Sequence, residues 1–161
     1  MVTINKAWHL LFIRRADNDK DYHSGQVAFP GGRHETDDLS MESTALREAW
    51  EEVGLRPTDV HILGHLKDHV STTSYRIRPI VGRVPWPYPL RIDKKEVSRC
   101  FTIPLDWLAM PDNRETRHRR FSRQQSLIPV IYFRDYEGEM LWGATAKITV
   151  ELIDTLMKSK V

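Results

Sequence analysis

The chain has 161 residues, a formal net charge of +2, and a hydrophobic fraction of 40% that includes five tryptophans. This length is typical of one domain with a buried core, and we predict a single domain over residues 1–161. The composition excludes a disordered chain, and because no apolar run approaches about 18 residues we expect no membrane-spanning segment. Cys100 is the one cysteine, which excludes an intramolecular disulfide. Together with the absence of a signal-peptide core, it indicates a cytoplasmic protein.

Short apolar segments predict strands near the start of the chain. The run over residues 7–14 is mostly apolar and predicts a buried strand. Residues 15–25 are polar and rich in aspartate, which indicates a loop, and residues 27–29 predict a short strand that stops at a Pro-Gly-Gly turn. Residues 1–6 are too short, by this interpretation, to supply a further strand ahead of the first one.

A helix is predicted from Ser40, where apolar residues begin to recur every four positions, to Gly54, a natural C-terminal stop. Glu48, Glu51 and Glu52 lie on this helix, and because a helix turns about 100° per residue they share a face of roughly 100°. Like charges placed this way repel each other, so a cation beside them would explain the pattern. Oxygen ligands favour Mg²⁺, Mn²⁺ or Ca²⁺ over zinc. Taken alone, the three residues also fit a solvated acidic face.

The second half of the chain mixes predicted strands with two helices. The expected elements are a hairpin of residues 60–70 and 75–84, strands over 97–103, 126–133 and 139–142, a short helix over 104–108 and a closing helix over 144–157. A proline-rich loop before the strand at 97–103 carries Trp86 and Tyr88. Because the elements mix without a strict βαβ repeat, we predict an α/β fold with a mixed sheet and helices on both of its sides.

A run of basic residues precedes the strand at 126–133. It consists of Arg114, Arg117, His118, Arg119, Arg120 and Arg123. One interpretation is a patch that binds substrate phosphates or RNA. We favour a solvated loop, because charge runs usually face water, and we do not expect a nucleic-acid partner.

The segment Arg47–Leu55, with the sequence Arg-Glu-Ala-Trp-Glu-Glu-Val-Gly-Leu, resembles the second half of the Nudix box, the signature of the Nudix hydrolases. The box has the form G-x5-E-x7-R-E-U-x-E-E-x-G-U, in which U is aliphatic. The first half departs from it: the opening glycine falls at Arg33, next to Gly32, and the early acidic position falls at Leu39, after two aspartates. The loop is thus one residue longer than the pattern, which is a feature of the coenzyme A pyrophosphatase branch.

An upstream motif is similar to the same branch. Leu10, Leu11 and Arg14 match its start, and the run Gly25–Gly32 matches its end. A second arginine of that motif is Asp21 here, a charge reversal that concerns the substrate more than the fold. The resemblance covers roughly residues 8–157.

The resemblance implies a Nudix-type α/β/α sandwich with a mixed central sheet, and a cofactor of Mg²⁺ or Mn²⁺. It implies Glu48, Glu51 and Glu52 as metal ligands, with a backbone carbonyl near Gly32. Glu51, Glu48 and Arg47 are the catalytic candidates, and the substrate-binding candidates are Arg14, Gly25, Phe29 and Gly31.

Some roles stay open at this point. Arg47 either orients a box carboxylate or forms an ordinary surface ion pair. Gly31 and Gly32 either allow the backbone to approach a metal or phosphate closely or make only a tight turn. Glu96, Glu137 and Glu139 are further candidates for the catalytic base.

The implied reaction is hydrolysis of a pyrophosphate bond in a nucleoside diphosphate derivative. Coenzyme A is the favoured substrate, with an adenine that we expect to stack on Trp86 or Tyr88; ADP-ribose, NADH and dinucleoside polyphosphates are the alternatives. A catalytically silent module that senses nucleotides is a different class, and the intact glutamates argue against it. RNA binding through the basic run is a third. The expected binding partner is a small nucleotide substrate. A homodimer is compatible with such a chain.

Overall fold

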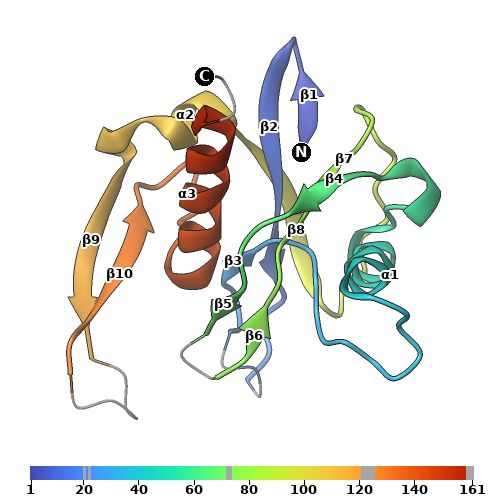
Figure 1. Ribbon diagram of the computed structural model, residues 1–161, viewed down its shortest axis with the longest axis horizontal. Coiled ribbons are helices and arrows are strands. Elements are labelled where there is room, and N and C mark those ends of the chain that lie inside the picture. Colours follow the sequence, from blue (N-terminus) through green and yellow to red (C-terminus); the bar gives the residue numbers. More distant parts are fainter. Residues whose placement is uncertain (20, 22, 72–73, 121–125, 159–161) are drawn as a thin grey trace. The chain divides into compact units, whose positions relative to one another are not determined.

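The computed structural model describes residues 1–161 except 20, 22, 72–73, 121–125 and 159–161 (Figure 1). Its elements in chain order are β1 Val2–Ile4, β2 Ala7–Arg15, β3 Val27–Ala28, α1 Met41–Val53, the 3-10 helix η1 Pro57–Asp59, β4 His61–His65, β5 His69–Val70, β6 Arg76–Ile77, β7 Ile80–Arg83, β8 Val97–Pro104, α2 Leu105–Ala109, the 3-10 helix η2 Pro111–Asn113, β9 Arg114–Arg119, β10 Ile128–Phe133 and α3 Gly143–Lys158. Contacts divide the chain into two compact units. The first unit is Met1–His65 with Ile80–Pro104, and the second is Leu66–Pro79 with Leu105–Val161.

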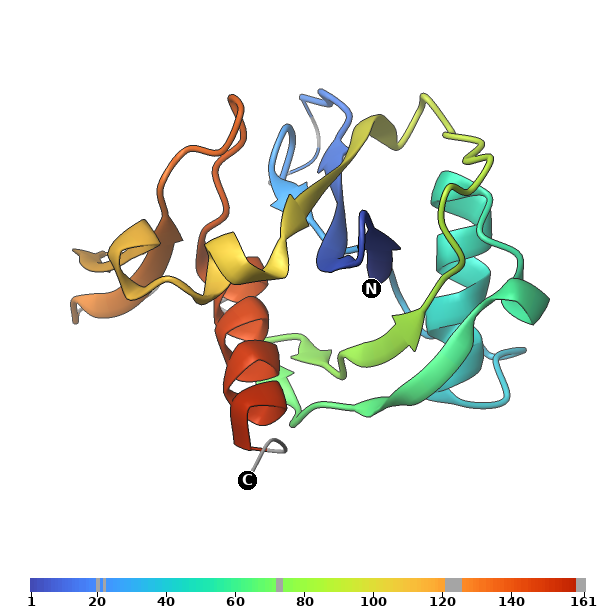
Figure 2. The ribbon, with the colours of Figure 1, turned by 90° about the horizontal axis from the view of Figure 1, so that it is seen from above.

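Strand β2 is the centre of the first unit. It pairs antiparallel with β1, β3 and β8, which confirms the strand predicted over residues 7–14. Leu10, Leu11, Phe12 and Ile13 are all buried, because both faces of the strand are covered, and this explains why it is a continuous apolar run rather than an alternating one. Helix α1 lies against β7 and β8 (Figure 2) and adds Val53 to the core on the Leu11 side.

The first six residues form more structure than the sequence suggested. Strand β1 pairs with β2 through a turn at Asn5 and Lys6, both of which have positive φ, 49° and 67°. Two such residues give the tight turn that joins antiparallel strands, and Val2 is fully buried by the pairing. The expectation that this segment is too short for a strand is therefore wrong, because the turn itself uses only two residues.

The hairpin predicted over residues 60–70 and 75–84 forms as two shorter pairs. Strand β4 pairs with β7, in the first unit, and β5 pairs with β6, in the second, both antiparallel. Between the pairs, the N–H of Leu66 still donates to the carbonyl of Pro79 at 3.0 Å. The prediction of antiparallel pairing is confirmed, while the predicted continuity is wrong.

The second unit contains a strand pair where a basic loop was expected. Strand β9 carries most of the basic run and pairs antiparallel with the apolar β10, so the loop prediction is wrong, although β9 is largely exposed. Arg123 lies outside the described residues. Helix α3 packs against β10 and α2, as the predicted closing helix should. The strand predicted over 139–142 is wrong: Glu139 and Trp142 make only isolated bridges, to Tyr136 and Tyr132.

All strand pairs made by the described residues are antiparallel. The parallel pairing that a mixed sheet requires therefore does not occur in this part of the chain, whereas the predicted mixture of strands and helices is confirmed. Across the same residues, no helix combines the length and the apolar character needed to cross a membrane.

Candidate active site

Helix α1 begins and ends at residues that fix its position. Ser40 caps the N-terminus: its side chain accepts from the N–H of Ser43, and the Ser43 hydroxyl accepts from the N–H of Ser40. At the other end Gly54 has φ 73°, and a Cβ there would lie 2.9 Å from Cβ of Arg91. Glycine is required both by this backbone conformation and by the close neighbour. The helix predicted from Ser40 to Gly54 is confirmed.

The three glutamates of α1 differ in exposure. Glu52 is 2% exposed, and one of its oxygens accepts from the N–H of Gly31 at 2.9 Å. The side chain of Glu48 is 13% exposed, whereas that of Glu51 is 53% exposed. The helix face therefore presents a buried carboxylate, Glu52, and a mostly covered one, Glu48, to the Pro-Gly-Gly turn, and a third at the rim.

The two glycines of the turn allow the backbone to approach those carboxylates. Gly31 has φ 151°, a conformation that side chains rarely adopt. A Cβ on Gly32 would lie 2.3 Å from Oε1 of Glu48, so any larger residue would displace that carboxylate. The turn is thus shaped around Glu48 and Glu52 and is more than a change of chain direction.

Arg47 links the glutamates to the loop before the helix. Its Nε and one terminal nitrogen donate to the two oxygens of Asp38 at 3.0 Å each. The other terminal nitrogen donates to Glu48 at 3.1 Å and to Glu51 at 2.9 Å. A further bond of 2.8 Å reaches the carbonyl of Arg33. The bonds from Arg47 hold the pKa of Asp38 well below its usual range.

Asp38 occupies the acidic position of the box, which the motif count had placed at Leu39. Its side chain is 6% exposed and pairs with Arg47, while Leu39 is 97% exposed. Five residues separate Gly32 from Asp38, as in the box pattern, so the extra residue lies after the acid rather than before it. Counting back from Gly54 misses this, because it places the insertion at the glycine.

Burial and mutual repulsion shape the electrostatics of the site. Burial raises the pKa of Glu52 to about 7, with Glu48 and Glu96 adding to the effect and the Gly31 N–H and Arg15 opposing it. Burial also raises the pKa of Glu48, against the charge of Arg47. A site that disfavours its own ionised carboxylates is one in which a cation would be strongly stabilised.

Glu96 is a fourth carboxylate close enough to act on both buried glutamates. The turn that carries it is anchored to α1: the N–H of Asp93 donates to the carbonyl of Glu52 at 2.9 Å, and the N–H of Glu96 to the carbonyl of Asp93 at 3.1 Å. The other two candidate bases, Glu137 and Glu139, belong to the second unit.

The residues predicted to bind substrate lie around β2 and β3. Arg14 is opposite Val27 and Arg99 in the sheet. Gly25 has φ 67°, and the Phe29 ring lies 4.8 Å from that of Phe12 between ring centroids.

Asp21 has a local partner that accounts for its charge. One of its oxygens lies 2.7 Å from a terminal nitrogen of Arg15, and the other accepts from the N–H of His23 at 2.9 Å. The His23 N–H, with help from Arg15, lowers the pKa of the Asp21 carboxyl. The charge reversal noted in the sequence is therefore balanced within the first unit by Arg15.

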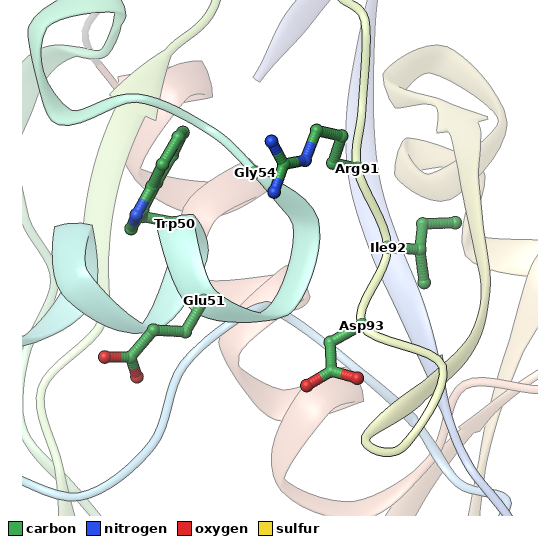
Figure 3. Close-up of a pocket in the computed structure, with 6 residues that line it drawn as sticks. All are labelled: Trp50, Glu51, Gly54, Arg91, Ile92 and Asp93. Atoms are coloured by element: carbon green, nitrogen blue, oxygen red, sulfur yellow. The ribbon is translucent and has the colours of Figure 1, made fainter.

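The aromatic residues expected to stack on adenine have other contacts. The hydroxyl of Tyr88 donates to Asp59 at 2.7 Å and accepts from the N–H of Arg56 at 3.1 Å. Both Trp86 and Tyr88 pack against the core of the first unit. A cavity of about 610 Å³ lies beside the C-terminal end of α1 (Figure 3). It is lined by Trp50, Glu51, Gly54, Arg91, Ile92 and Asp93.

The donors at the glutamate face suit a hard divalent cation. Glu48 and Glu52 offer buried carboxylate oxygens beside a turn with no side chain in the way, and Mg²⁺, Mn²⁺ and Ca²⁺ prefer such oxygens. In the described residues no three His, Cys, Asp or Glu side chains form a ready metal-binding group. Two of the glutamates bind Arg47 here, so binding of an ion would require these side chains to turn.

Comparison with known proteins identifies the class to which this fold and glutamate-bearing helix belong. The NUDIX domain model matches residues 1–125, and the chain belongs to the Nudix family. Members of this family are hydrolases that act on nucleoside diphosphate derivatives with divalent metal ions, so the predictions of an enzyme and of its general reaction are confirmed.

Curated relatives agree with this assignment. The proteins named "Uncharacterized Nudix hydrolase NudL" of Yersinia pestis and Yersinia pseudotuberculosis are 42% identical to the chain over 140 residues, which cover 86% of the chain and 68% of each relative.

Solved structures share the fold. A Nudix hydrolase of M. smegmatis, RenU, superposes with a TM-score of 0.55 at 16% identity, over 67% of this chain and 68% of that one. An Ap4A hydrolase of C. elegans in a binary complex superposes with a TM-score of 0.52 at 13% identity, over 61% of this chain and 70% of that one. The predicted Nudix fold class is confirmed.

Proposed function

We propose that this chain is a pyrophosphohydrolase dependent on Mg²⁺ or Mn²⁺, that residues 1–161 form one Nudix hydrolase domain, and that its preferred substrate is coenzyme A. The products would be 3′,5′-ADP and 4′-phosphopantetheine. The observation that carries the proposal is the helix face on which Glu52 is buried, and Glu48 is mostly covered, against a turn of two glycines. An acidic face that merely meets water has no reason to be closed in this way.

The position of each residue sets the role that it would have. Glu48 and Glu52, with the carbonyl of Gly32, would hold the ion from the buried side, and Glu51 would hold it from the rim. An ion bound there supplies neutralisation of phosphoryl charge and activation of water. Arg47 is held in place by its two-pronged bond with Asp38. It keeps the carboxylates of Glu48 and Glu51 on this helix face, from which they would turn to meet the ion.

Hydrolysis forms a bond from a water oxygen to one phosphorus and breaks that atom's bond to the bridging oxygen, which leaves with the other phosphate. The proton of the water goes to a carboxylate. Glu51 is one of the candidates within the box, and its exposure at the rim leaves it open to water. Glu96 is the second candidate, because its charge acts on both buried glutamates.

Coenzyme A is favoured by the motif at Leu10, Leu11 and Arg14, by the run Gly25–Gly32, and by the extra residue in the box loop. Leu39, the first residue of the lengthened stretch after Asp38, is almost fully exposed before the cap of α1, and the Asp38–Arg47 pair is intact. Asp21, in contrast, stands where the motif has its second arginine. It pairs with Arg15, so this position supplies no positive charge for a substrate phosphate.

The test is kcat/KM for coenzyme A, ADP-ribose, NADH and a dinucleoside polyphosphate, with Mg²⁺ and with Mn²⁺, and with products identified by mass. We expect coenzyme A to have the highest value. If another substrate exceeds it about tenfold, which is about 1.4 kcal/mol of transition-state binding, coenzyme A is not the preferred substrate although the reaction type stands.

A further inference from the structure

We propose that the cavity beside the C-terminal end of α1 binds the base of a nucleotide, and that it selects a base with an exocyclic amino group, such as adenine. Trp50, Arg91 and Asp93 make this base site. The inference rests on the proposed function in one respect only, that the ligand is a nucleotide. With a volume of about 610 Å³, the cavity is within the usual range of small-molecule sites.

Two flat groups suit the faces of a base. Trp50 lies at the cavity with 42% of its surface exposed, which leaves much of a large apolar ring in water. Arg91 extends its guanidinium over the turn at Gly54 toward the side of Trp50 (Figure 3). Indole and guanidinium planes both stack on nucleobases, so a base that entered here would gain contact with both.

A carboxylate gives the cavity its preference. In Figure 3 Asp93 lies toward the end opposite Trp50 and Arg91. One of its oxygens accepts from the N–H of Lys95 at 2.9 Å, which holds the carboxylate in place. A held acceptor of this kind recognises a hydrogen-bond donor, such as the amino group of adenine, and rejects a base edge that carries an oxygen instead.

The same charges exclude the phosphate end of a nucleotide. The cavity lies at the C-terminus of α1, whose last turn carries no basic residue, and this end of a helix repels anions. Asp93 adds to the repulsion. Arg91 in turn disfavours a small cation. A neutral flat group with a donor on its edge, such as a base with an amino group, satisfies all of these conditions together.

The cavity is tied to the helix that carries the box glutamates. The N–H of Arg91 donates to the carbonyl of Val53 at 3.0 Å, and the N–H of Asp93 to that of Glu52 at 2.9 Å. Glu51 belongs both to the cavity and to the glutamate face. A nucleotide whose base lies at Trp50 would therefore have its position set relative to the reacting phosphates by a single rigid helix.

The experiment measures equilibrium binding of AMP and of IMP, which differ at the amino group, in Mg²⁺ and without turnover. Trp50→Leu should weaken AMP binding at least about tenfold, because base stacking is lost, and Trp50→Phe should restore most of it. Trp8→Leu is the matched control: Trp8 is similarly exposed, at 40%, but lies on β2 outside the cavity, and its loss should leave AMP binding within about twofold. Thermal unfolding of each variant checks that it is folded.

A second variant tests the selectivity. Asp93→Asn keeps an oxygen for the Lys95 N–H while removing the charge, and it should reduce the preference for AMP over IMP several-fold. Unchanged AMP binding in Trp50→Leu, or an unchanged AMP-to-IMP ratio in Asp93→Asn, overturns the base site.

The outcomes separate this inference from the proposed function. If the wild-type chain hydrolyses none of the substrates tested but binds AMP through Trp50, the base site stands and the reaction is wrong. If it hydrolyses them while Trp50→Leu changes neither AMP binding nor kcat/KM for adenine substrates, the reaction stands and the base site is wrong.

Discussion

Glu52 is a carboxylate that the folded chain keeps almost entirely out of water. Burial raises its pKa from 4.5 to about 7, so without a bound cation the folded state holds a proton that the unfolded chain releases. Between these two pH values folding takes up a proton, and stability therefore falls as the pH rises through this window. Below this window the Glu52 carboxyl does not lower the stability of the fold. Above it the loss of stability is constant, on the order of 3 kcal/mol.

This linkage predicts the behaviour of Glu52→Gln in excess chelator. Because glutamine does not titrate, the variant should not lose the stability that the wild type loses as the pH is raised from about 5 to about 8. The stability difference in favour of the variant should grow by on the order of 3 kcal/mol. Free energies of unfolding in denaturant at both pH values give the result. A difference that is the same at both would mean that Glu52 does not titrate in this window.

Gly32 gives a second test at the scale of one residue. A Cβ on Gly32 would lie 2.3 Å from a carboxylate oxygen of Glu48, and that flexible end can swing away. Gly32→Ala should therefore lower kcat/KM about 100-fold with a change in stability below about 1 kcal/mol.

The matched control is Gly82→Ala, where a Cβ would meet Cγ1 of Val60 at 2.8 Å in the packed part of the same unit. That variant should lose stability by about 1–3 kcal/mol and retain activity. The opposite pattern, an unstable but active Gly32→Ala, would show that Glu48 is not needed where it lies.

At the scale of an element, α1 depends on how it ends. Gly54 has φ 73°, and a Cβ on it would lie 2.9 Å from Cβ and 3.0 Å from N of Arg91. Gly54→Ala should thus strain the backbone and push residues 91–93 from the helix, with a loss of about 1–3 kcal/mol. Thermal unfolding measures it. Unchanged stability would mean that the segment at 91–93 is not held to the helix as described.

The start and the end of α1 could be predicted from the sequence because their signals are local: a serine cap, a four-residue apolar period and a glycine. The strand at residues 7–14 was equally clear as a run of apolar residues. Strand β9 was not, because its residues are mostly charged and carry no apolar strand pattern of their own. It is a strand because it pairs with the next one, the apolar β10.

The residues of the site likewise differ in whether the sequence revealed them. Glu48, Glu51 and Glu52 were found from their helical spacing, whereas Asp38 was assigned one position late because a motif count cannot place an insertion. Trp50 carried no functional signal of its own in the sequence. Its place in a cavity depends on Arg91 and the residues after it, which reach the helix some forty positions later.

At the scale of the whole molecule, the residues of the glutamate face, the glycine turn and the base site all belong to the first unit, Met1–His65 with Ile80–Pro104. The family model extends from there into the second unit, to residue 125. The proposed chemistry therefore depends on contacts within one compact unit.

The central claim is that the buried glutamates of α1 hold a divalent ion for pyrophosphate hydrolysis. The most direct measurement is kcat/KM for coenzyme A as Mg²⁺ is titrated, in the wild type and in Glu52→Gln, with products identified by mass. We predict activity that requires Mg²⁺ and falls at least about 100-fold in the variant, or about 2.7 kcal/mol of transition-state stabilisation. Near-normal turnover by Glu52→Gln, or full activity of the wild type in excess chelator, would contradict the account.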